Sequence, residues 1–389
     1  MSDMFGRRRW EWLAGVLCAS VLLLAGCGDF FNKDGGGGGG GGGGSTGSYI
    51  YVGTQTGVLV GYSVSTTGAL ATLSGSPNQF ATTAINALAV TPANTFLYAG
   101  VAGIGVYGLG IASTTGVTTL INSNVLVQDV APLALTVDPS GKYLLVAGLA
   151  NGVPAVGEYL INSDGTLAEV TGSPVSITFT SGTDTGNASV TNIAVAPNSS
   201  YVFVTLGQLG VAPLPFNTSG GLSANTQIIS PKAPNGISNQ DLGLAVNAAS
   251  TALFVGETNN GVRVFTIGAN QFTEISGSPF KAGAQPRSLA FDGTGDFLYA
   301  ANGSDATISG YSVLASGTLT ALAGSPFSSV GAGPSALALD QSKKFLLSAN
   351  LGGSPDLQLF SFDSTTAGKI NPGATATNAT GASAIASTH

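Results

Sequence analysis

A few charged and amide side chains in this chain could serve a ligand or a reaction. Only 8% of the residues are charged, so those that fall in predicted loops stand out. A cation at Arg287 could hold an anionic group, while a carboxylate at Glu257 or Asp305 could activate a water molecule for hydrolysis. Four further polar residues are candidate ligand-binding groups, namely Asn302, Asn350, Asp241 and Asp129.

These candidates occur in two sets of loops that would meet at one mouth of a central channel. One set leads into the predicted innermost strands, and the other set joins the predicted second and third strands. The resulting ring of side chains would be mostly acidic, with one or two cations. Such a ring is either a ligand-binding mouth or an ordinary solvated face, and the sequence leaves both interpretations open.

Histidine and cysteine are almost absent, which excludes several kinds of active site. The one histidine is His389, the last residue, and the two cysteines are Cys18 and Cys27. A Ser-His-Asp set, a zinc site or a haem ligand cannot be assembled from these residues. We therefore expect no bound metal and no cofactor.

One short apolar phrase recurs seven times and indicates the elements that must position the candidates. The phrase reads FLYAAN from Phe297 and varies in the other copies, whose starts are 45 to 58 residues apart. A β-rich unit of that length is typical of a propeller blade. The seven copies start at Tyr49, Phe96, Tyr143, Tyr201, Ala252, Phe297 and Phe345.

The sixth unit shows most clearly how a blade is built. Its predicted strands are separated by turns rich in Gly, Asn and Asp, and helical periodicity is absent. The strands cover residues 288–291, 297–301, 307–313 and 319–322. Small and large residues alternate in the first of these strands, as the crowded centre of a ring requires. The sequence therefore predicts an all-β fold of four-stranded antiparallel blades.

The two ends of the repeat region indicate how the ring closes. The first unit begins at its second strand with Tyr49, so it lacks an inner strand. The last unit is complete near Ala376, yet the chain continues through Ala384-Ile385-Ala386, which echoes Ala336-Leu337-Ala338. A C-terminal inner strand would complete the N-terminal blade and pair two otherwise open edges. We expect a seven-bladed propeller over residues 49–389 that is closed in this way.

Residues 1–26 have the features of an export signal rather than of a folded segment. Arginines at positions 7 to 9 precede a short apolar run that ends in Leu-Ala-Gly-Cys at Cys27. This ending is similar to a bacterial lipobox, whose cysteine carries a diacylglycerol. The alternative is an ordinary signal peptide that contains a cysteine. Residues 27–48 include ten consecutive glycines and are expected to form a flexible tether.

Lipidation of Cys27 would place the protein in the cell envelope, held to a membrane by its N-terminus. Gly28 stands where some Gram-negative bacteria use aspartate to retain lipoproteins in the inner membrane, so the outer membrane is favoured. Without residues 1–26 the chain has 9 basic and 17 acidic residues and no basic run, which excludes nucleic acid as a partner. We expect a monomer whose partner is a protein or a carbohydrate at one face of the propeller.

The phrases of the sixth unit resemble those of one family of propellers. Gln285 to Phe291 reads QPRSLAF and is followed by FLYAAN from Phe297. Together with SGTLTALAGSPF from Ser316, these phrases resemble the lactonase-type seven-bladed propellers and the related YVTN-repeat proteins. The resemblance covers essentially all of residues 49–389 and implies a fold of the same type.

The resemblance also implies an activity. The 6-phosphogluconolactonases of this family carry a Pro-Arg-His phrase and an Asn-Glu pair at these places. Arg287 and Asn302 match the arginine and the asparagine. Ser288 stands where the histidine would be, and Gly303 replaces the glutamate. Two of the four matched positions therefore differ from the family's enzymes.

Three functions are compatible with the sequence. The two departures from the family pattern favour an extracytoplasmic binding or interaction module without catalysis. Export favours the same interpretation, because the substrate of the family's enzymes is cytosolic. The first alternative is a lactonase that hydrolyses a sugar lactone, with Arg287 and either Glu257 or Asp305 at its site. The second alternative is a structural repeat protein of the cell surface.

Overall fold

The computed structural model describes residues 47–79, 81–122, 124–179, 188–219, 221–232 and 239–389. The export signal at 1–26, the lipidation of Cys27 and almost all of the 27–48 tether lie outside these residues and stay predictions. Every regular element in the described residues is a strand. The described residues form no helix that is long and apolar enough to cross a membrane.

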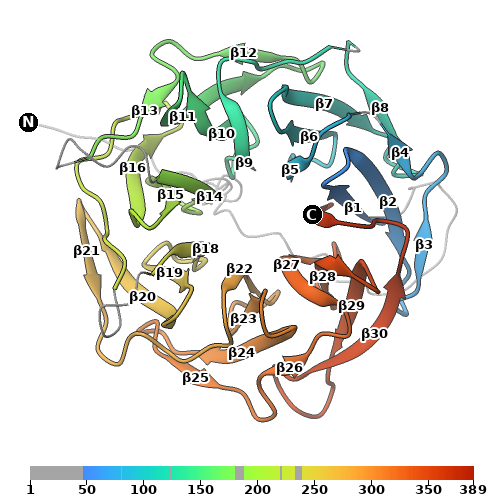
Figure 1. The fold of residues 1–389 in the computed structure, drawn as a ribbon, viewed down its shortest axis with the longest axis vertical. Helices are drawn as coiled ribbons and strands as arrows, with labels where there is room; N and C mark the ends of the chain where they lie inside the picture. The colour runs from blue at the N-terminus through green and yellow to red at the C-terminus, as the bar shows by residue number, and fades with distance from the viewer. Residues whose placement is uncertain (1–46, 80, 123, 180–187, 220, 233–238) are drawn as a thin grey trace, which may run out of the picture. The chain divides into compact units, whose positions relative to one another are not determined.

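Four-stranded antiparallel blades surround a central axis, as Figure 1 shows. We number the blades in the order of their second strands. The inner strands of blades one to seven are β31 (Ala382–Ser387), β5 (Ile85–Val90), β9 (Ala131–Val137), β14 (Ala188–Val195), β18 (Asp241–Val246), β22 (Pro286–Phe291) and β27 (Ala332–Leu339). The second strands are β1 (Ser48–Thr54), β6 (Phe96–Val101), β10 (Tyr143–Ala150), β15 (Tyr201–Gly207), β19 (Ala252–Glu257), β23 (Phe297–Asn302) and β28 (Phe345–Gly353).

The remaining strands complete each blade toward the rim. The third strands are β2 (Val58–Val64), β7 (Gly105–Ile111), β11 (Val153–Ile161), β16 (Val211–Asn217), β20 (Gly261–Gly268), β24 (Thr307–Val313) and β29 (Leu357–Phe362). The outer strands are β3 (Leu70–Thr72), β8 (Thr118–Leu120), β12 (Leu167–Glu169), β17 (Gly221–Leu222), β21 (Gln271–Glu274), β25 (Leu319–Ala321) and β30 (Ile370–Ala376). Three short strands also pair with third strands, namely β4 (Asn78–Gln79), β13 (Val175–Ser176) and β26 (Phe327–Ser328). The predicted all-β, seven-bladed architecture is confirmed.

Blades four and five are hydrogen-bonded to each other near the centre of the ring. Gly207 at the end of β15 pairs with Asp241 at the start of β18, so the strands of these two blades form one continuous sheet. The other five blades are separate sheets, which is why seven blades correspond to six hydrogen-bonded sheets. Asp241 is therefore held between two blades.

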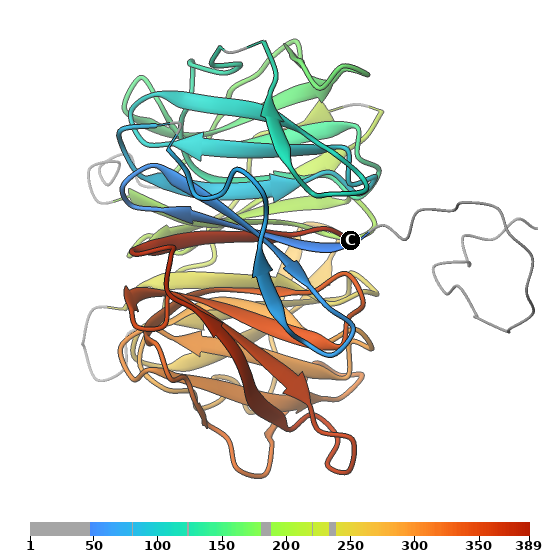
Figure 2. The same cartoon turned by 90° about the vertical axis from the view of Figure 1, so that its right-hand side faces the viewer.

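The last strand closes the ring, as the sequence predicts. β31 pairs antiparallel with β1 at five residue pairs. The red C-terminal strand lies beside the blue first blade in Figure 1 and in the side view of Figure 2. Thr388 extends this contact, because its Oγ1 accepts a hydrogen bond from Tyr49 N at 2.9 Å. The first blade is thus built from both ends of the repeat region.

The apolar core lies between neighbouring blades. Tyrosines at the third position of the repeated phrase illustrate this packing, because each hydroxyl donates to a glycine carbonyl in the next blade. The bonds are Tyr51 to Gly116 (2.7 Å), Tyr98 to Gly165 (2.9 Å) and Tyr299 to Gly368 (2.6 Å). The three glycines have φ between 68° and 81°, a left-handed conformation that other residues rarely adopt. These contacts join the second strand of one blade to the turn before the outer strand of the next blade.

The inner strands begin, and the second strands end, at the same face of the ring. Pro286 at the start of β22 pairs with Asn302 at the end of β23, because the two strands are antiparallel. Asp241 pairs with Glu257 in the same way in blade five. We call this end of the ring the mouth face. It is the face to which the sequence analysis assigned the candidate site residues.

Candidate active site

A cavity of about 270 Å³ lies on the axis of the ring, where the inner strands meet. Each of the seven inner strands contributes to its lining, mostly through small and short polar side chains. Arg287 is the only charged residue among the described residues that line it. A single cation in an otherwise uncharged pocket is a specific place for a negatively charged atom.

Each inner strand has a β-bulge or other register shift near its start, which leaves at least one residue out of the regular ladder. Four such residues donate a hydrogen bond to a backbone carbonyl at the start of the next inner strand. The bonds are Asn86 Nδ2 to Pro132 O (3.1 Å), Thr191 Oγ1 to Asp241 O (3.2 Å), Ser335 Oγ to Ala382 O (3.1 Å) and Ser383 Oγ to Ile85 O (2.8 Å). These bonds tie neighbouring blades together around the cavity.

Arg287 is the bulged residue of β22, but the hydrogen bond between blades six and seven is made by its neighbour Ser288. Ser288 Oγ accepts a hydrogen bond from Leu337 N at 3.0 Å. The Arg287 side chain lies over Gly303, since a Cβ added at Gly303 would be 2.6 Å from Arg287 Nε. Arg287 Nη2 donates to Gln285 Oε1 at 2.8 Å, and the residue is exposed. Because a guanidinium has several donors, this neutral contact leaves others for a ligand.

Asn302 and Asp305 lie beside the loop that leads to Arg287. A Cβ added at Gly283 would be 2.6 Å from Asn302 Nδ2 and 2.7 Å from Asp305 Oδ2, so both side chains surround this glycine. Asn302 is fully buried, and its Oδ1 has no hydrogen-bond partner among the described residues. Asp305 is exposed and accepts a hydrogen bond from the backbone of the facing loop. The structure thus brings three of the predicted site residues together in blade six.

Two other predicted ligand-binding residues lie in different blades. Asn350 has in blade seven the place that Asn302 has in blade six, and it is fully buried. Its amide donates one hydrogen bond and accepts another within its own blade, at 3.0 and 2.9 Å. Asp129 is exposed on the connection between blades two and three, where it accepts from the Tyr159 hydroxyl at 2.7 Å. Their part in ligand binding stays a prediction.

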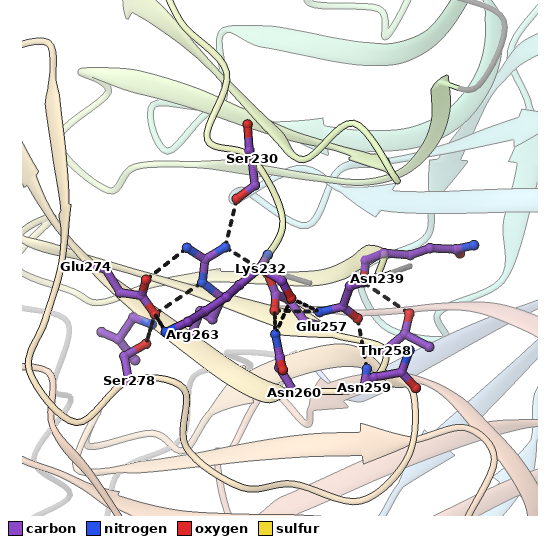
Figure 3. A network of polar contacts seen from close by, with 12 residues as sticks. Ser230, Lys232, Asn239, Glu257, Thr258, Asn259, Asn260, Arg263, Glu274 and Ser278 are labelled. Carbon is purple, nitrogen blue, oxygen red and sulfur yellow. Dashed lines mark hydrogen bonds and ion pairs between the residues drawn. The ribbon is translucent and has the colours of Figure 1, made fainter. Parts of the chain in front are cut away.

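Glu257 lies inside a network of polar contacts in blade five (Figure 3). Its side chain has no exposed surface, and four donors reach its two oxygens. The donors are Arg263 Nη1 (2.8 Å) and Lys232 N (3.1 Å) on Oε1, and Asn239 Nδ2 (2.7 Å) and Asn260 Nδ2 (2.5 Å) on Oε2. Because its oxygens are buried and engaged, Glu257 cannot accept a proton from a water molecule in the cavity. This geometry leaves Asp305 as the candidate base.

Asp241 faces Glu257 across blade five and is also fully buried. Neither of its carboxyl oxygens has a hydrogen-bond partner among the residues that the structure describes. Burial, and then the charge of Glu257, raise the pKa of Asp241 well above its usual value, so the group holds its proton. The expectation of an acidic ring at the mouth is therefore wrong in blade five, because both carboxyl groups are enclosed by protein.

The structure adds two residues that the sequence analysis did not single out, Arg263 and Glu274. Arg263 Nη2 and Nε contact the two oxygens of Glu274 at 3.0 and 3.2 Å, while its Nη1 bonds to Glu257. Arg263 is only 6% exposed. Its place in the alternating run VRVF could have indicated a buried cation, since a charge that faces the interior of a sheet needs an acidic partner.

Arg287 and Asp305 carry two kinds of side chain that a hydrolytic site needs, and their role in such a site stays a prediction. A guanidinium can stabilise the negative charge that develops on a carbonyl oxygen. An exposed carboxylate on the neighbouring loop can accept a proton from water. Among the described residues, no group of three or more His, Cys, Asp or Glu side chains is placed to hold a metal ion.

Comparison with known proteins relates this propeller to a group of similar structures. A candidate 6-phosphogluconolactonase from Bacteroides fragilis has a TM-score of 0.71 at 17% identity, covering 90% of this chain and 100% of that one. One from Bacteroides uniformis has a TM-score of 0.70 at 16% identity, with coverages of 88% and 100%. The periplasmic gluconolactonase of Pseudomonas aeruginosa has a TM-score of 0.66 at 20% identity, with coverages of 88% and 99%. Identities this low establish the shared fold alone. No curated protein matches the chain in sequence.

The comparisons overturn the expectation of a binding module without catalysis. The family described as "Lactonase, 7-bladed beta-propeller" matches residues 49–381. The description of this family names a lactonase, so the match favours the lactonase alternative over the binding and structural ones. Ser288 and Gly303 are therefore departures within one family. With nearly the whole propeller matched, this chain belongs to the lactonase family of seven-bladed β-propellers.

Proposed function

We propose that this protein hydrolyses the ester bond of a sugar lactone in the central cavity. The observation that carries the proposal is the placement of Arg287, the one charged residue among the described lining residues, on the axis of the ring. The family match and the similarity to a periplasmic gluconolactonase support the choice of substrate class.

In this proposal the lactone lies in the cavity with its carbonyl oxygen at the Arg287 guanidinium. Asp305 accepts a proton from a water molecule, whose oxygen attacks the carbonyl carbon. The guanidinium stabilises the negative charge that develops on the carbonyl oxygen. The ring C–O bond then breaks, the ring oxygen takes up a proton, and the product is the open hydroxy acid.

The size of the cavity favours a single small ring as the substrate. Its volume of about 270 Å³ is just below that of typical ligand pockets, which enclose roughly 300–1,000 Å³. Short polar side chains of the lining, such as Ser288 and Asn192, can hydrogen-bond to sugar hydroxyls. We therefore propose a monosaccharide lactone.

Asp305→Asn should lower kcat by about 10²- to 10⁴-fold, the contribution typical of a positioned base. KM should change little, because asparagine keeps the shape of the side chain. The measurement is acid release from a panel of sugar lactones, corrected for spontaneous hydrolysis. Asp296→Asn is the matched control, since Asp296 is an exposed acid on the opposite face of blade six. Wild-type kcat in Asp305→Asn would show that another group activates the water.

We further propose that the protein is a lipoprotein of the cell envelope, attached to the outer membrane through Cys27. The export signal at residues 1–26, the lipobox-like ending and the similarity to a periplasmic enzyme support this location. Cells grown with radiolabelled palmitate should yield a labelled, membrane-associated protein, and Cys27→Ala should abolish the label. An unlabelled wild-type protein would contradict the proposal.

A further inference from the structure

We propose that a buried cluster in blade five, formed by Asp241, Glu257 and Arg263, is a positioning site for Arg287 in blade six. Asp241 takes part in this positioning site as a buried group opposite Glu257. The inference rests on the proposed function, since it assigns these residues to the placement of the side chain that would bind the reacting carbonyl.

The backbone that carries Arg287 packs directly on blade five. A Cβ added at Gly256 would lie 2.3 Å from the carbonyl oxygen of Pro286, and one added at Gly243 would lie 3.2 Å from the carbonyl carbon of Arg287. Only glycine permits so close an approach. Gly256 immediately precedes Glu257, so a shift of Glu257 moves the surface on which the Arg287 backbone rests.

A chain of hydrogen bonds links Glu257 to the guanidinium. Glu257 holds the turn that follows it through its bond from Asn260 Nδ2. Thr258 O, in that turn, accepts from Gln285 N at 3.3 Å, and Gln285 Oε1 accepts from Arg287 Nη2 at 2.8 Å. Gln285 has a φ of 56°, a left-handed conformation that glutamine rarely adopts unless its surroundings hold it there. The anchored turn in blade five is thus one of the contacts that orient Gln285, and through it Arg287.

The charges in the cluster explain why it needs a proton. Arg263 Nη1 is 2.8 Å from Glu257, and its Nη2 is 3.0 Å from Glu274. Lys232 Nζ lies 3.8 Å from Glu274, and its side chain is 50% exposed. Two carboxylates and two cations are therefore balanced. An ionised Asp241 would add an unmatched negative charge directly opposite Glu257.

Among the charged groups near Asp241, Glu257 is the nearest one that opposes the ionisation of Asp241. The charged groups that act on it are Glu257 on β19 and Arg263 on β20. Glu274 on β21 pairs with Arg263 and with Lys232 on the preceding connection, and the backbone of Arg287 on β22 packs against Gly243. From blade four, Thr191 Oγ1 donates to the carbonyl oxygen of Asp241 and Thr205 Oγ1 to that of Leu242.

The pH dependence of the cluster follows from the direction of one pKa shift. The pKa of Asp241 is raised by burial and by Glu257, so the folded protein keeps a proton at pH values where the unfolded chain has lost it. The protonated arrangement is present below the raised pKa and is lost as pH rises through it. Ionised Asp241 then repels Glu257, and the support under Arg287 weakens as the pH rises through that pKa.

The test is steady-state lactone hydrolysis by the full-chain protein at pH values from the usual carboxyl pKa upward, corrected for spontaneous ring opening. Glu257→Gln should lower kcat by roughly 10- to 100-fold with a smaller change in KM, as expected when a group that acts in the transition state is misplaced. Asp241→Asn, which carries permanent amide protons, should hold kcat constant where that of the wild type falls. Glu158→Gln alters a buried acid of blade three and should keep the wild-type pH profile.

A second readout follows Arg287 itself and does not depend on turnover. The NMR signal of its Nε–Hε group, identified by its absence in Arg287→Ala, should shift in the wild type as the pH rises through the pKa of Asp241, and should stay constant in Asp241→Asn. Wild-type kcat and an unshifted Arg287 signal in Glu257→Gln would overturn the inference. Should Glu257→Gln fail to fold, a fall of kcat with rising pH that persists in Asp241→Asn would overturn it. A wild type that hydrolyses no lactone would overturn the proposed function instead, and the Arg287 signal would then decide whether the cluster positions it.

Discussion

Arg287→Ala should remove most of the lactone hydrolysis, lowering kcat/KM by about 10²- to 10³-fold. The guanidinium is the one charge among the described residues that line the cavity, so its loss leaves the carbonyl oxyanion with neutral donors only. The loss should fall mainly on kcat, because the negative charge on the oxygen develops only in the transition state. Hydrolysis of a lactone series by the purified wild type and variant measures the effect.

The fold should survive this substitution. Arg287 is exposed, its side chain bonds to Gln285, and the tie to blade seven comes from Ser288. We expect the free energy of unfolding to change by less than about 0.5 kcal/mol. Lys281→Ala should keep full activity as the matched control, since Lys281 is an exposed cation on the same connection. Equal activity of Arg287→Ala and the wild type would refute the role of the guanidinium.

Deletion of residues 380–389 should lower the free energy of unfolding by more than about 4 kcal/mol, far beyond the usual cost of removing a terminus. The deletion removes β31, which pairs with β1 at five positions and buries Ala382, Ala384 and Ala386. The backbone groups along the inner edge of β1 would lose their partners and become exposed. Urea unfolding followed by circular dichroism measures the change.

The control for this deletion removes only His389, which is exposed, and should cost less than about 1 kcal/mol. A synthetic peptide with the sequence of residues 380–389 should restore stability to the shortened protein, because an extended peptide can pair with a free strand edge. If the shortened protein unfolded like the wild type, the ring would hold without its last strand.

The fold could be predicted because each repeat carries its own strands and turns. In blade six the predicted strands at 288–291, 297–301, 307–313 and 319–322 differ from β22 to β25 by at most two residues at either end. Closure was also predictable, since Ala384-Ile385-Ala386 repeats the small-large-small pattern of an inner strand. Both predictions depend on local patterns, which a single sequence shows directly.

The environment of each site residue could not be predicted in the same way. Glu257 and Asp305 both lie near the end of a second strand, so their spacing made them equal candidates for the base. They differ because Arg263, Asn239 and Asn260 enclose Glu257, whereas Asp305 is exposed. These partners come from separate loops, and their approach depends on the three-dimensional packing of blade five. Arg287 could be identified because its place in the repeated phrase coincides with the bulge that faces the cavity.

β31 is the last strand in chain order, yet it occupies the centre of the first blade. A chain emerging from a ribosome or passing through a translocon must therefore leave the inner edge of β1 open until residue 387 has arrived. Pairing between such distant segments is slow, because most of the chain has to be ordered before the ends can meet. A chain that terminates before β31 exposes the inner edge of β1, which the complete ring covers. Quality-control proteases can recognise the truncated chain by this exposed edge.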